Sequence, residues 1–360
     1  MRKNPVSQRG RGAQSADVPQ RFGLAQRETD GDWRDLSETV DGPTPKLRTT
    51  VTEETPKSIL SFNQSPDIGF DRSINAYRGC EHGCIYCFAR PTHAFHDLSP
   101  GLDFETKLFA KPQAADLLRK TLARPKYRPR PIAMGTNTDP YQPIESRYRI
   151  TRQVLEVCLE TRHPVTITTK SDRVLHDLDL LEELARYNLV AVSVSVTSLD
   201  PELSGKLEPR AASPAKRLKA LENLVKHGVP AHCAIAPVIP AVTDAFMEEI
   251  VTRVAEAGVQ NCGWIPLRLP HEVAPLFREW LEVHYPERAG KVMSIVRSIR
   301  NGRDNDPDFF TRLKPKGVWA DLFRARFRIA CRRAGIENPA IELDTVAFRP
   351  PQTGRQLQLL

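Results

Sequence analysis

Three cysteines within eight positions are the residues best suited to chemistry: Cys80, Cys84 and Cys87. The pattern C-x3-C-x2-C places three thiolates on one tight loop, where Gly79 and Gly83 allow the backbone to turn. Three thiolates are one short of a tetrahedral structural zinc site. Either a nearby histidine completes such a site, or the fourth position stays open for chemistry. The histidines near the loop are His82, His93 and His96.

Two kinds of metal site are therefore open to this loop. Zinc ligands usually come as two separated pairs, which a single crowded group of three does not match. An iron–sulfur cluster in which one iron lacks a protein ligand matches it better. The remaining cysteines have no neighbouring thiol in the sequence: Cys158, Cys233, Cys262 and Cys331.

The N-terminal sequence and the hydropathy pattern indicate a compartment. MRKNPVSQRGRG lacks the apolar core of a signal peptide, and no stretch reaches the roughly 18 apolar residues of a membrane-spanning helix. We therefore expect a cytoplasmic protein without a membrane partner, where a cysteine cluster indicates metal and not disulfides. Residues 1–60 lack periodicity and are rich in Arg, Gln, Thr, Pro and Asp, which predicts a flexible N-terminal arm.

Positive charge is concentrated near the C-terminus. Lys and Arg number 52 against 44 Asp and Glu, a net charge of +8, and residues 300–335 hold ten basic and four acidic residues. The segment 318–335 predicts an amphipathic helix with an apolar stripe formed by Leu322, Phe323, Phe327, Ala330 and Cys331. Its cationic side carries Arg324, Arg326, Arg328, Arg332 and Arg333. This side is either a solvated surface or binds a nucleic acid or an acidic flavodoxin or ferredoxin.

Strands and helices alternate after the cysteine loop. Strands are predicted over 72–77, 131–136, 164–170, 189–197, 229–238 and 259–267. Helices are predicted over 150–161, from Ser171, from Ser213 to Gly228 and from Thr243 to Gly258. This alternation predicts parallel βαβ units with right-handed crossovers. Three further helices are expected over 271–285, 288–300 and 318–335.

One predicted strand alternates regularly between aliphatic and polar residues. Val192 and Val194 alternate with Ser193 and Ser195, and the preceding strand ends in the same way at Lys170. A parallel sheet covered on both faces should be apolar on both. We therefore expect a barrel whose polar inner face lines a cavity, although small residues bonded to one another would give the same pattern.

The loop and its surroundings resemble a known superfamily. Cys80-Glu-His-Gly-Cys84-Ile-Tyr-Cys87, after a strand and before βα repeats, resembles the motif of radical S-adenosylmethionine (SAM) proteins. Three segments are similar to the spore-photoproduct-lyase-like branch: SPDIGFDRSINAYRGCEHGCIYCFARPTHAF, GTNTDPYQPIE and LEPRAASPAKRLKAL. The resemblance implies an α/β fold with a partial (β/α)6 TIM-type barrel. We expect the arm over 1–60, the radical SAM core over 61–268, a helical C-terminal extension over 269–340 and a tail over 341–360.

The resemblance also implies cofactors and their ligands. Cys80, Cys84 and Cys87 would bind a [4Fe–4S] cluster, with SAM on the fourth iron. By the same resemblance, the residues that contact SAM would be Tyr86, Gly135, Thr136, Thr138, Lys170, Ser193, Ser195, Arg210, Ala236 and Val238. Lys170 and Arg210 can instead form surface ion pairs, and Tyr86 can simply pack.

The chemistry that follows from the resemblance is the reductive cleavage of SAM. The 5′-deoxyadenosyl radical would take a hydrogen from an unidentified substrate, with a flavodoxin- or ferredoxin-type protein as the electron donor. The alternatives are an enzyme that modifies or repairs nucleic acid, and a non-catalytic metal-bound protein that binds nucleic acid.

One segment departs from the family pattern. Spore photoproduct lyases carry a cysteine after the second strand that returns a hydrogen to the product radical, whereas residues 134–139 here read MGTNTD. A hydroxyl holds its hydrogen too strongly to replace a thiol, so we do not expect repair of the spore thymine dimer. Asp139, Tyr141 and Glu145 are substrate-side candidates, or they stabilise the Pro-rich loop.

Overall fold

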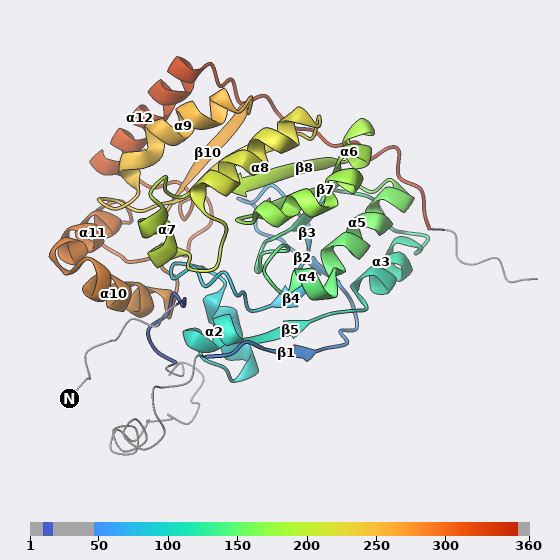
Figure 1. Cartoon of the computed structure of the whole chain (residues 1–360), viewed down its shortest axis with the longest axis horizontal. Helices are drawn as coiled ribbons and strands as arrows, with labels where there is room; N and C mark the ends of the chain where they lie inside the picture. The colour runs from blue at the N-terminus through green and yellow to red at the C-terminus, as the bar shows by residue number, and fades with distance from the viewer. Residues whose placement is uncertain (1–9, 17–46, 352–360) are drawn as a thin grey trace, which may run out of the picture.

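A seven-stranded sheet forms the centre of the computed structural model, which describes residues 10–16 and 47–351 (Figure 1). Six strands run parallel in chain order, and β2 joins β3 antiparallel at one edge. The strands are β2 (Leu60–Phe62), β3 (Arg72–Ile74), β6 (Ile132–Met134), β7 (Val165–Thr169), β8 (Val190–Ser195), β9 (Ala231–Val238) and β10 (Asn261–Pro266). This order confirms the predicted α/β fold with a partial TIM-type barrel.

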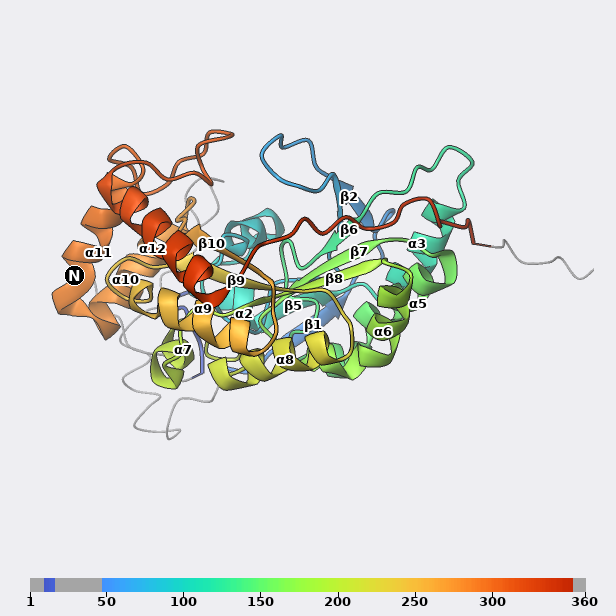
Figure 2. The ribbon, with the colours of Figure 1, turned by 90° about the horizontal axis from the view of Figure 1, so that it is seen from above.

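Helices cover the apolar outer face of this sheet (Figure 2). They are α3 (Ala114–Leu122), α5 (Ile150–Thr161), α6 (Leu178–Arg186), α8 (Pro214–Lys226) and α9 (Met247–Glu256). The short helices η3 (Asp172–Asp177) and η4 (Asp244–Phe246) precede α6 and α9, so two predicted helices begin with a tighter turn. Other connections contain η2 (Arg90–His96), α2 (Leu102–Thr106), α4 (Glu145–Tyr148) and α7 (Pro201–Leu207).

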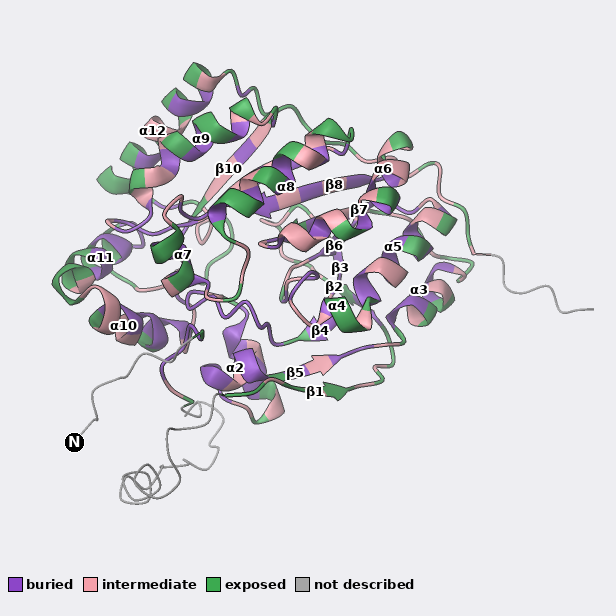
Figure 3. Cartoon of the chain, in the orientation of Figure 1, coloured by how far each residue is buried: buried purple, intermediate pink, exposed green. Residues whose placement is uncertain are grey.

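The alternation predicted for the central strands is present. Val190, Val192 and Val194 are completely buried in the core. Their strand, β8, is largely buried beneath the helices (Figure 3). On the opposite face Thr168 pairs in register with Ser193, and the Thr168 residue is exposed. The hydroxyl of Ser193 lies 2.9 Å from His232 Nδ1, so the inner face is polar and partly bonded to itself.

A second, three-stranded sheet packs beside the barrel and was not predicted. It has the order β1 (Thr50–Glu53), β5 (Lys107–Ala110) and β4 (Tyr77–Arg78). The predicted strand 72–77 is wrong as one element, because the chain leaves the large sheet after Ile74 and enters the small one at Tyr77. The two residues between them carry the chain from the barrel to the cysteine loop.

Both described ends of the chain pack on the core. Within the predicted arm, Arg11–Gln14 are buried and residues 50–53 form β1, while 1–9 and 17–46 lie outside the described residues. In the predicted tail, the amide of Asp344 donates to the Asn188 carbonyl at 2.9 Å. The amide of Arg349 donates to the Thr161 carbonyl at 2.8 Å. This segment therefore crosses the amino-terminal ends of β8 and β7.

Three helices follow the barrel: α10 (Val273–His284), α11 (Pro286–Ser298) and α12 (Val318–Ala334). α12 packs on α9 (Figure 1), and its residues Ala320, Phe323, Ala330 and Cys331 are buried. The prediction that Leu322 belongs to the buried stripe is wrong, since its side chain is 43% exposed. None of the described helices is long and apolar enough to cross a membrane.

Arg326 links α12 to η4 and to the start of α9. Its guanidinium donates to Glu248 at 2.6 Å and 2.7 Å and to Asp244 at 3.2 Å. We expect Arg326→Ala to lower the free energy of unfolding by roughly 1 kcal/mol, since the ion pair is bidentate but partly solvated. The exposed Arg333→Ala is the control and should leave the urea midpoint unchanged. Equal midpoints for both variants would contradict an anchoring role.

Candidate active site

The cysteine loop begins directly after β4 and is largely buried. Gly79 and Gly83 have φ angles of +71° and +66°, so the turn predicted from these glycines is present. Cys80 is 7% exposed and Cys84 9%. Burial raises the pKa of Cys80 and of Cys87, and raises that of Cys84 to about 12. The thiols of the protein alone therefore keep their protons at neutral pH, and metal binding would have to release them.

A fully buried ion pair holds the backbone of this loop. The Arg90 guanidinium donates to the carbonyls of Cys84 at 2.9 Å and Gly83 at 3.0 Å, and to the Glu105 carboxylate at 2.5 Å. Neither charged side chain has any exposed surface. Sequence reasoning missed both residues, because nothing in the sequence distinguishes them from surface charges.

The N-terminal segment 10–16 closes the outer side of the same loop. The amides of Gly12 and Ala13 donate to Glu105 at 3.0 Å and 2.8 Å, and the Leu102 amide donates to the carbonyl of Ser15 at 2.9 Å. A Cβ on Gly12 would lie 1.8 Å from the carbonyl oxygen of Gly83. Only glycine therefore fits at position 12 without moving the cysteine loop.

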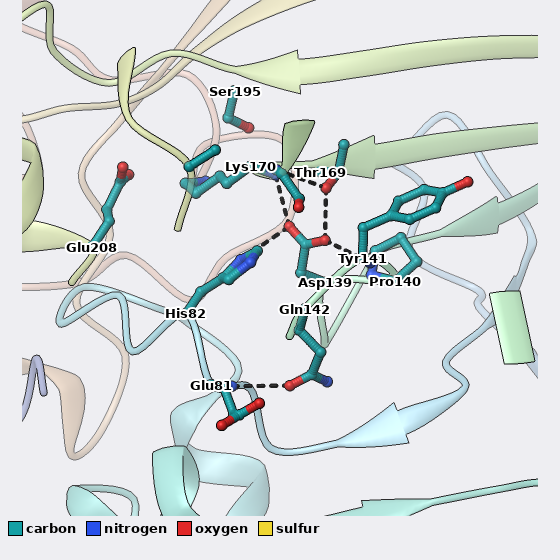
Figure 4. A network of polar contacts seen from close by, with 12 residues as sticks. Glu81, His82, Asp139, Pro140, Tyr141, Gln142, Thr169, Lys170, Ser195 and Glu208 are labelled. Atoms are coloured by element: carbon teal, nitrogen blue, oxygen red, sulfur yellow. Dashed lines mark hydrogen bonds and ion pairs between the residues drawn. The ribbon is translucent and has the colours of Figure 1, made fainter. Parts of the chain in front are cut away.

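Asp139, in the loop after β6, joins the cysteine loop to the carboxyl end of β7 (Figure 4). Its carboxylate accepts from the Thr169 hydroxyl at 2.6 Å and the Lys170 amide at 2.7 Å, and it lies 3.3 Å from His82 Nδ1. Burial alone would raise the pKa of Asp139, but His82 and these hydrogen bonds hold it below its usual value. Gln142 adds a second link, because its side chain accepts from the Glu81 amide at 2.9 Å.

The other two substrate-side candidates lie in the core beneath this loop. Tyr141 is 1% exposed, and Glu145 accepts hydrogen bonds from the Tyr77 hydroxyl and from the Thr151 amide. Burial raises the pKa of Glu145 to about 7. These contacts support the structural alternative for Tyr141 and Glu145.

Glu208 forms a second buried network on the other side of the cysteine loop. It accepts from the hydroxyls of Tyr86 and Thr197 and pairs with Arg217, which is 1% exposed. Burial alone would raise the pKa of Glu208, but Arg217 and Lys170 lower it to about 2, so it is ionised. Sequence reasoning missed Glu208 and Arg217, although Glu208 lies in a segment that carries the family resemblance.

Several of the predicted SAM contacts gather at the same edge. The Lys170 ammonium lies 5.8 Å from the centroid of the Tyr86 ring, and Ser195 is 2% exposed at the end of β8 (Figure 4). Gly135 has a φ of +88°, and a Cβ there would lie 2.1 Å from the Thr168 carbonyl oxygen, so β6 and β7 approach closely.

The remaining residues predicted to contact SAM are bonded to other protein groups or lie in the core. Asn75 bonds to the Thr136 hydroxyl at 3.0 Å and accepts from the Thr138 amide at 3.4 Å. Arg210 pairs with Glu81 at 3.1 Å. On β9, the Ala236 carbonyl accepts from Thr197 at 3.3 Å, while Val238 is buried in the core. All of the predicted contacts with SAM, including those of Lys170, Ser193 and Ser195, stay predictions.

Among the described residues, no three His, Cys, Asp or Glu side chains are grouped so that they could hold one metal ion. A [4Fe–4S] cluster has a different requirement, because each thiolate binds its own iron. Cys80, Cys84 and Cys87 supply three thiols on one loop, whose tight turns are closed by hydrogen bonds from the Gly83 amide to the Cys80 carbonyl and from the Cys87 amide to the Cys84 carbonyl, each at 3.2 Å. This donor set fits such a cluster.

Comparisons with known proteins agree with this geometry. The sequence profile of the Radical SAM superfamily matches residues 74–254. An uncharacterized protein of Mycobacterium tuberculosis is 36% identical over 242 residues, which cover 66% of this chain and 71% of that protein. An uncharacterized protein of Methanocaldococcus jannaschii is 28% identical over 232 residues, which cover 64% of this chain and 83% of that protein.

Solved structures of spore photoproduct lyase share the architecture. A variant with dinucleoside spore photoproduct has a TM-score of 0.58 at 14% identity, and the match covers 88% of this chain and 86% of that one. Another variant, with bound AdoMet and dinucleoside spore photoproduct, has a TM-score of 0.57 at 15% identity, with 79% of each chain covered. At such identities the likeness concerns the fold. The chain therefore belongs to the radical SAM superfamily of enzymes and has the fold of spore photoproduct lyase.

Proposed function

We propose that this enzyme binds a [4Fe–4S] cluster through Cys80, Cys84 and Cys87 and cleaves SAM reductively to abstract a hydrogen atom from its substrate. The observation that carries the proposal is a loop with three thiols, two buried and one half-buried, that contacts the carboxyl end of β7 through His82 and Asp139. Barrel enzymes perform their chemistry at this end of the strands. The bound cluster and SAM together would supply a 5′-deoxyadenosyl radical.

The protein's own residues bind and orient the cofactors. Lys170 holds the carboxylate of SAM, because it is a cation on the polar inner edge beside the cysteine loop. Asp139 fixes the amide of Lys170 and, through His82, the loop itself. Glu208 and Thr197 hold the hydroxyl of Tyr86, so its ring keeps one orientation. The buried surroundings of the thiols keep water away from the reacting atoms.

The substrate differs from that of spore photoproduct lyase in this proposal. No thiol is present in residues 134–139 to return a hydrogen to a product radical. A flavodoxin- or ferredoxin-type electron donor, and a nucleic acid bound at the arginines of α12, stay predictions.

The first prediction concerns the cluster ligands. Replacing Cys80, Cys84 or Cys87 by Ala should remove most of the iron bound after anaerobic reconstitution, because each thiolate would bind a different iron. Cys158→Ala is the control, since Cys158 is buried in α5 away from the loop. The measurements are the iron content and the absorbance of the cluster near roughly 400 nm. Full iron content in Cys84→Ala would refute the assignment.

The second prediction concerns the glycine that closes the loop from outside. Gly12→Ala should displace residues 10–16 and speed the loss of iron under air, because the new Cβ would overlap the Gly83 carbonyl. The overlap should cost about 1–3 kcal/mol of unfolding free energy. Gly69→Ala is the matched control, since a Cβ there meets no atom within 4 Å. Identical iron-loss rates in the two variants would show that the segment does not protect the site.

The third prediction concerns SAM binding. Lys170→Ala should weaken SAM binding by about 1–3 kcal/mol while leaving the iron content unchanged, because it removes one charge-assisted hydrogen bond. Lys216→Ala is the control, since the Lys216 side chain is 67% exposed and lies 3.7 Å from Asp172. Equilibrium dialysis with the reconstituted protein gives the affinity. Unchanged affinity in Lys170→Ala would place this lysine outside the SAM site.

A further inference from the structure

A cavity of about 350 Å³ opens beside the proposed SAM site and shares Thr138 with the predicted SAM contacts. Its walls come from both sheets, from η2 and from the loop after β6, and they include Asn75, Arg78, His96, Lys111, Asn137 and Thr138. The volume lies within the range of small-molecule sites, which is roughly 300–1,000 Å³. The reaction proposed above needs a place for a substrate, and none of the contacts assigned to the cluster or SAM uses the basic wall of this cavity.

One wall of the cavity is the chain segment that leads into Asp139. The Asn75 side chain accepts from the Asn137 amide at 2.9 Å and donates to the Thr136 hydroxyl at 3.0 Å. Asn75 therefore fixes residues 136–138, with the cavity on one side and Asp139 following in the chain. A molecule in the cavity would lie against the loop that also contacts the cysteine loop through His82.

The charges around the cavity do not cancel. Lys111 and Arg78 are two cations that share one carboxylate, Glu54, which lies 2.7 Å from Arg78 and 3.7 Å from Lys111. The sum of these three charges is +1. The Lys111 ammonium has three N–H groups and donates one of them to the Asn75 carbonyl at 2.8 Å. The Lys111 residue is 8% exposed, so the surplus charge is shielded from bulk water and attracts an anion more strongly than a surface lysine does.

The cavity also offers uncharged groups for orientation. His96 lies on its wall, and burial lowers the pKa of this imidazole, so it is neutral at pH 7 and can donate or accept one hydrogen bond. Phe95, also on the wall, is 70% exposed and presents an apolar surface. A small molecule with one oxyanion and a less polar remainder matches this combination.

We propose that the cavity binds the substrate of this enzyme through a carboxylate or phosphate group held by Lys111 and Arg78. The proposal rests on the proposed function, and it assigns to the substrate a chemical class: a small organic oxyanion. The competing interpretation is that Glu54 alone satisfies both cations and that the cavity binds no anion.

The test uses inorganic phosphate and succinate as probes on the full, reconstituted chain. Ligand-observed NMR should detect binding of at least one probe to the wild-type protein, and the one that binds tells phosphate from carboxylate recognition. Lys111→Met should weaken that binding at least about tenfold, because it removes a shielded charge-assisted contact. Lys107→Met is the matched control, since Lys107 begins β5, the strand that Lys111 directly follows, but is 47% exposed and paired with Asp103.

A second variant guards against misfolding of Lys111→Met. Arg78→Met changes a side chain that is 43% exposed, and it should also weaken probe binding. The proposal fails if the wild-type protein binds neither probe at millimolar concentration, or if both variants bind as tightly as the wild type. Failure of the proposed function is read separately, as the absence of 5′-deoxyadenosine when dithionite-reduced wild-type protein is given SAM.

The affinity for succinate should also depend on pH in a defined direction. Burial lowers the pKa of Lys111 to about 8, so the ammonium loses its proton, and the cavity its surplus charge, as the pH rises through about 8. Arg78 and Glu54 are the charged groups that face Lys111, and a proton on His96 below neutral pH would only strengthen binding. Affinity that stays constant between pH 7 and pH 9 would contradict the role of Lys111.

Discussion

The buried ion pair between Arg90 and Glu105 determines the shape of the cysteine loop. Arg90 is bonded to two carbonyls of that loop, and Glu105 accepts two amides of the N-terminal segment. Removing one partner of such a pair usually costs about 3–5 kcal/mol, because the other charge is left buried. Most of these contacts go to backbone atoms, so the pair fixes the path of the chain while leaving the neighbouring side chains free to serve the cofactors.

A second buried pair, Glu208 with Arg217, acts from the opposite side. The segment after α7 contacts the loop directly, since the Ile85 amide donates to the Leu207 carbonyl at 3.1 Å and the Arg210 amide to the His82 carbonyl at 3.3 Å. The cysteine loop therefore lies between two separate buried ion pairs, Arg90 with Glu105 and Arg217 with Glu208. Its glycines turn the chain, and the ion pairs keep the turn in one place.

The sequence predicted the elements that follow local rules and missed those that depend on distant contacts. Residues 150–161 form a helix within the predicted limits, because an apolar residue every four positions requires a buried face. The three cysteines were found by their spacing alone. Arg90, Glu105 and Gly12 were missed because each is explained only by a partner far along the chain. The break of the strand 72–77 was missed for the same reason, since β4 exists only through its pairing with β5.

The polar face of the barrel strands shows a related limit. Alternation predicted which face is hydroxylated, and the pairing of Thr168 with Ser193 places those residues side by side. Alternation could not show that the His232 side chain would hydrogen-bond to the Ser193 hydroxyl, because this contact joins two neighbouring strands. Nor could it reveal the basic cavity, whose two cations, Arg78 on β4 and Lys111 just after β5, are far apart in the sequence.

The two ends of the chain are both used by the finished core. Gly12 packs against Gly83 at the cysteine loop, and Arg349 hydrogen-bonds to Thr161 on the far side of the barrel. There the ring of Phe348 is tilted against that of Tyr127 and meets that of His163 edge-on. On a ribosome the residues near 349 are made after the strands and helices of the barrel. The barrel is therefore synthesised well before the segment that covers its amino-terminal edge, and a nascent or prematurely terminated chain exposes the imidazole of His163 and the ring of Tyr127 until that segment arrives.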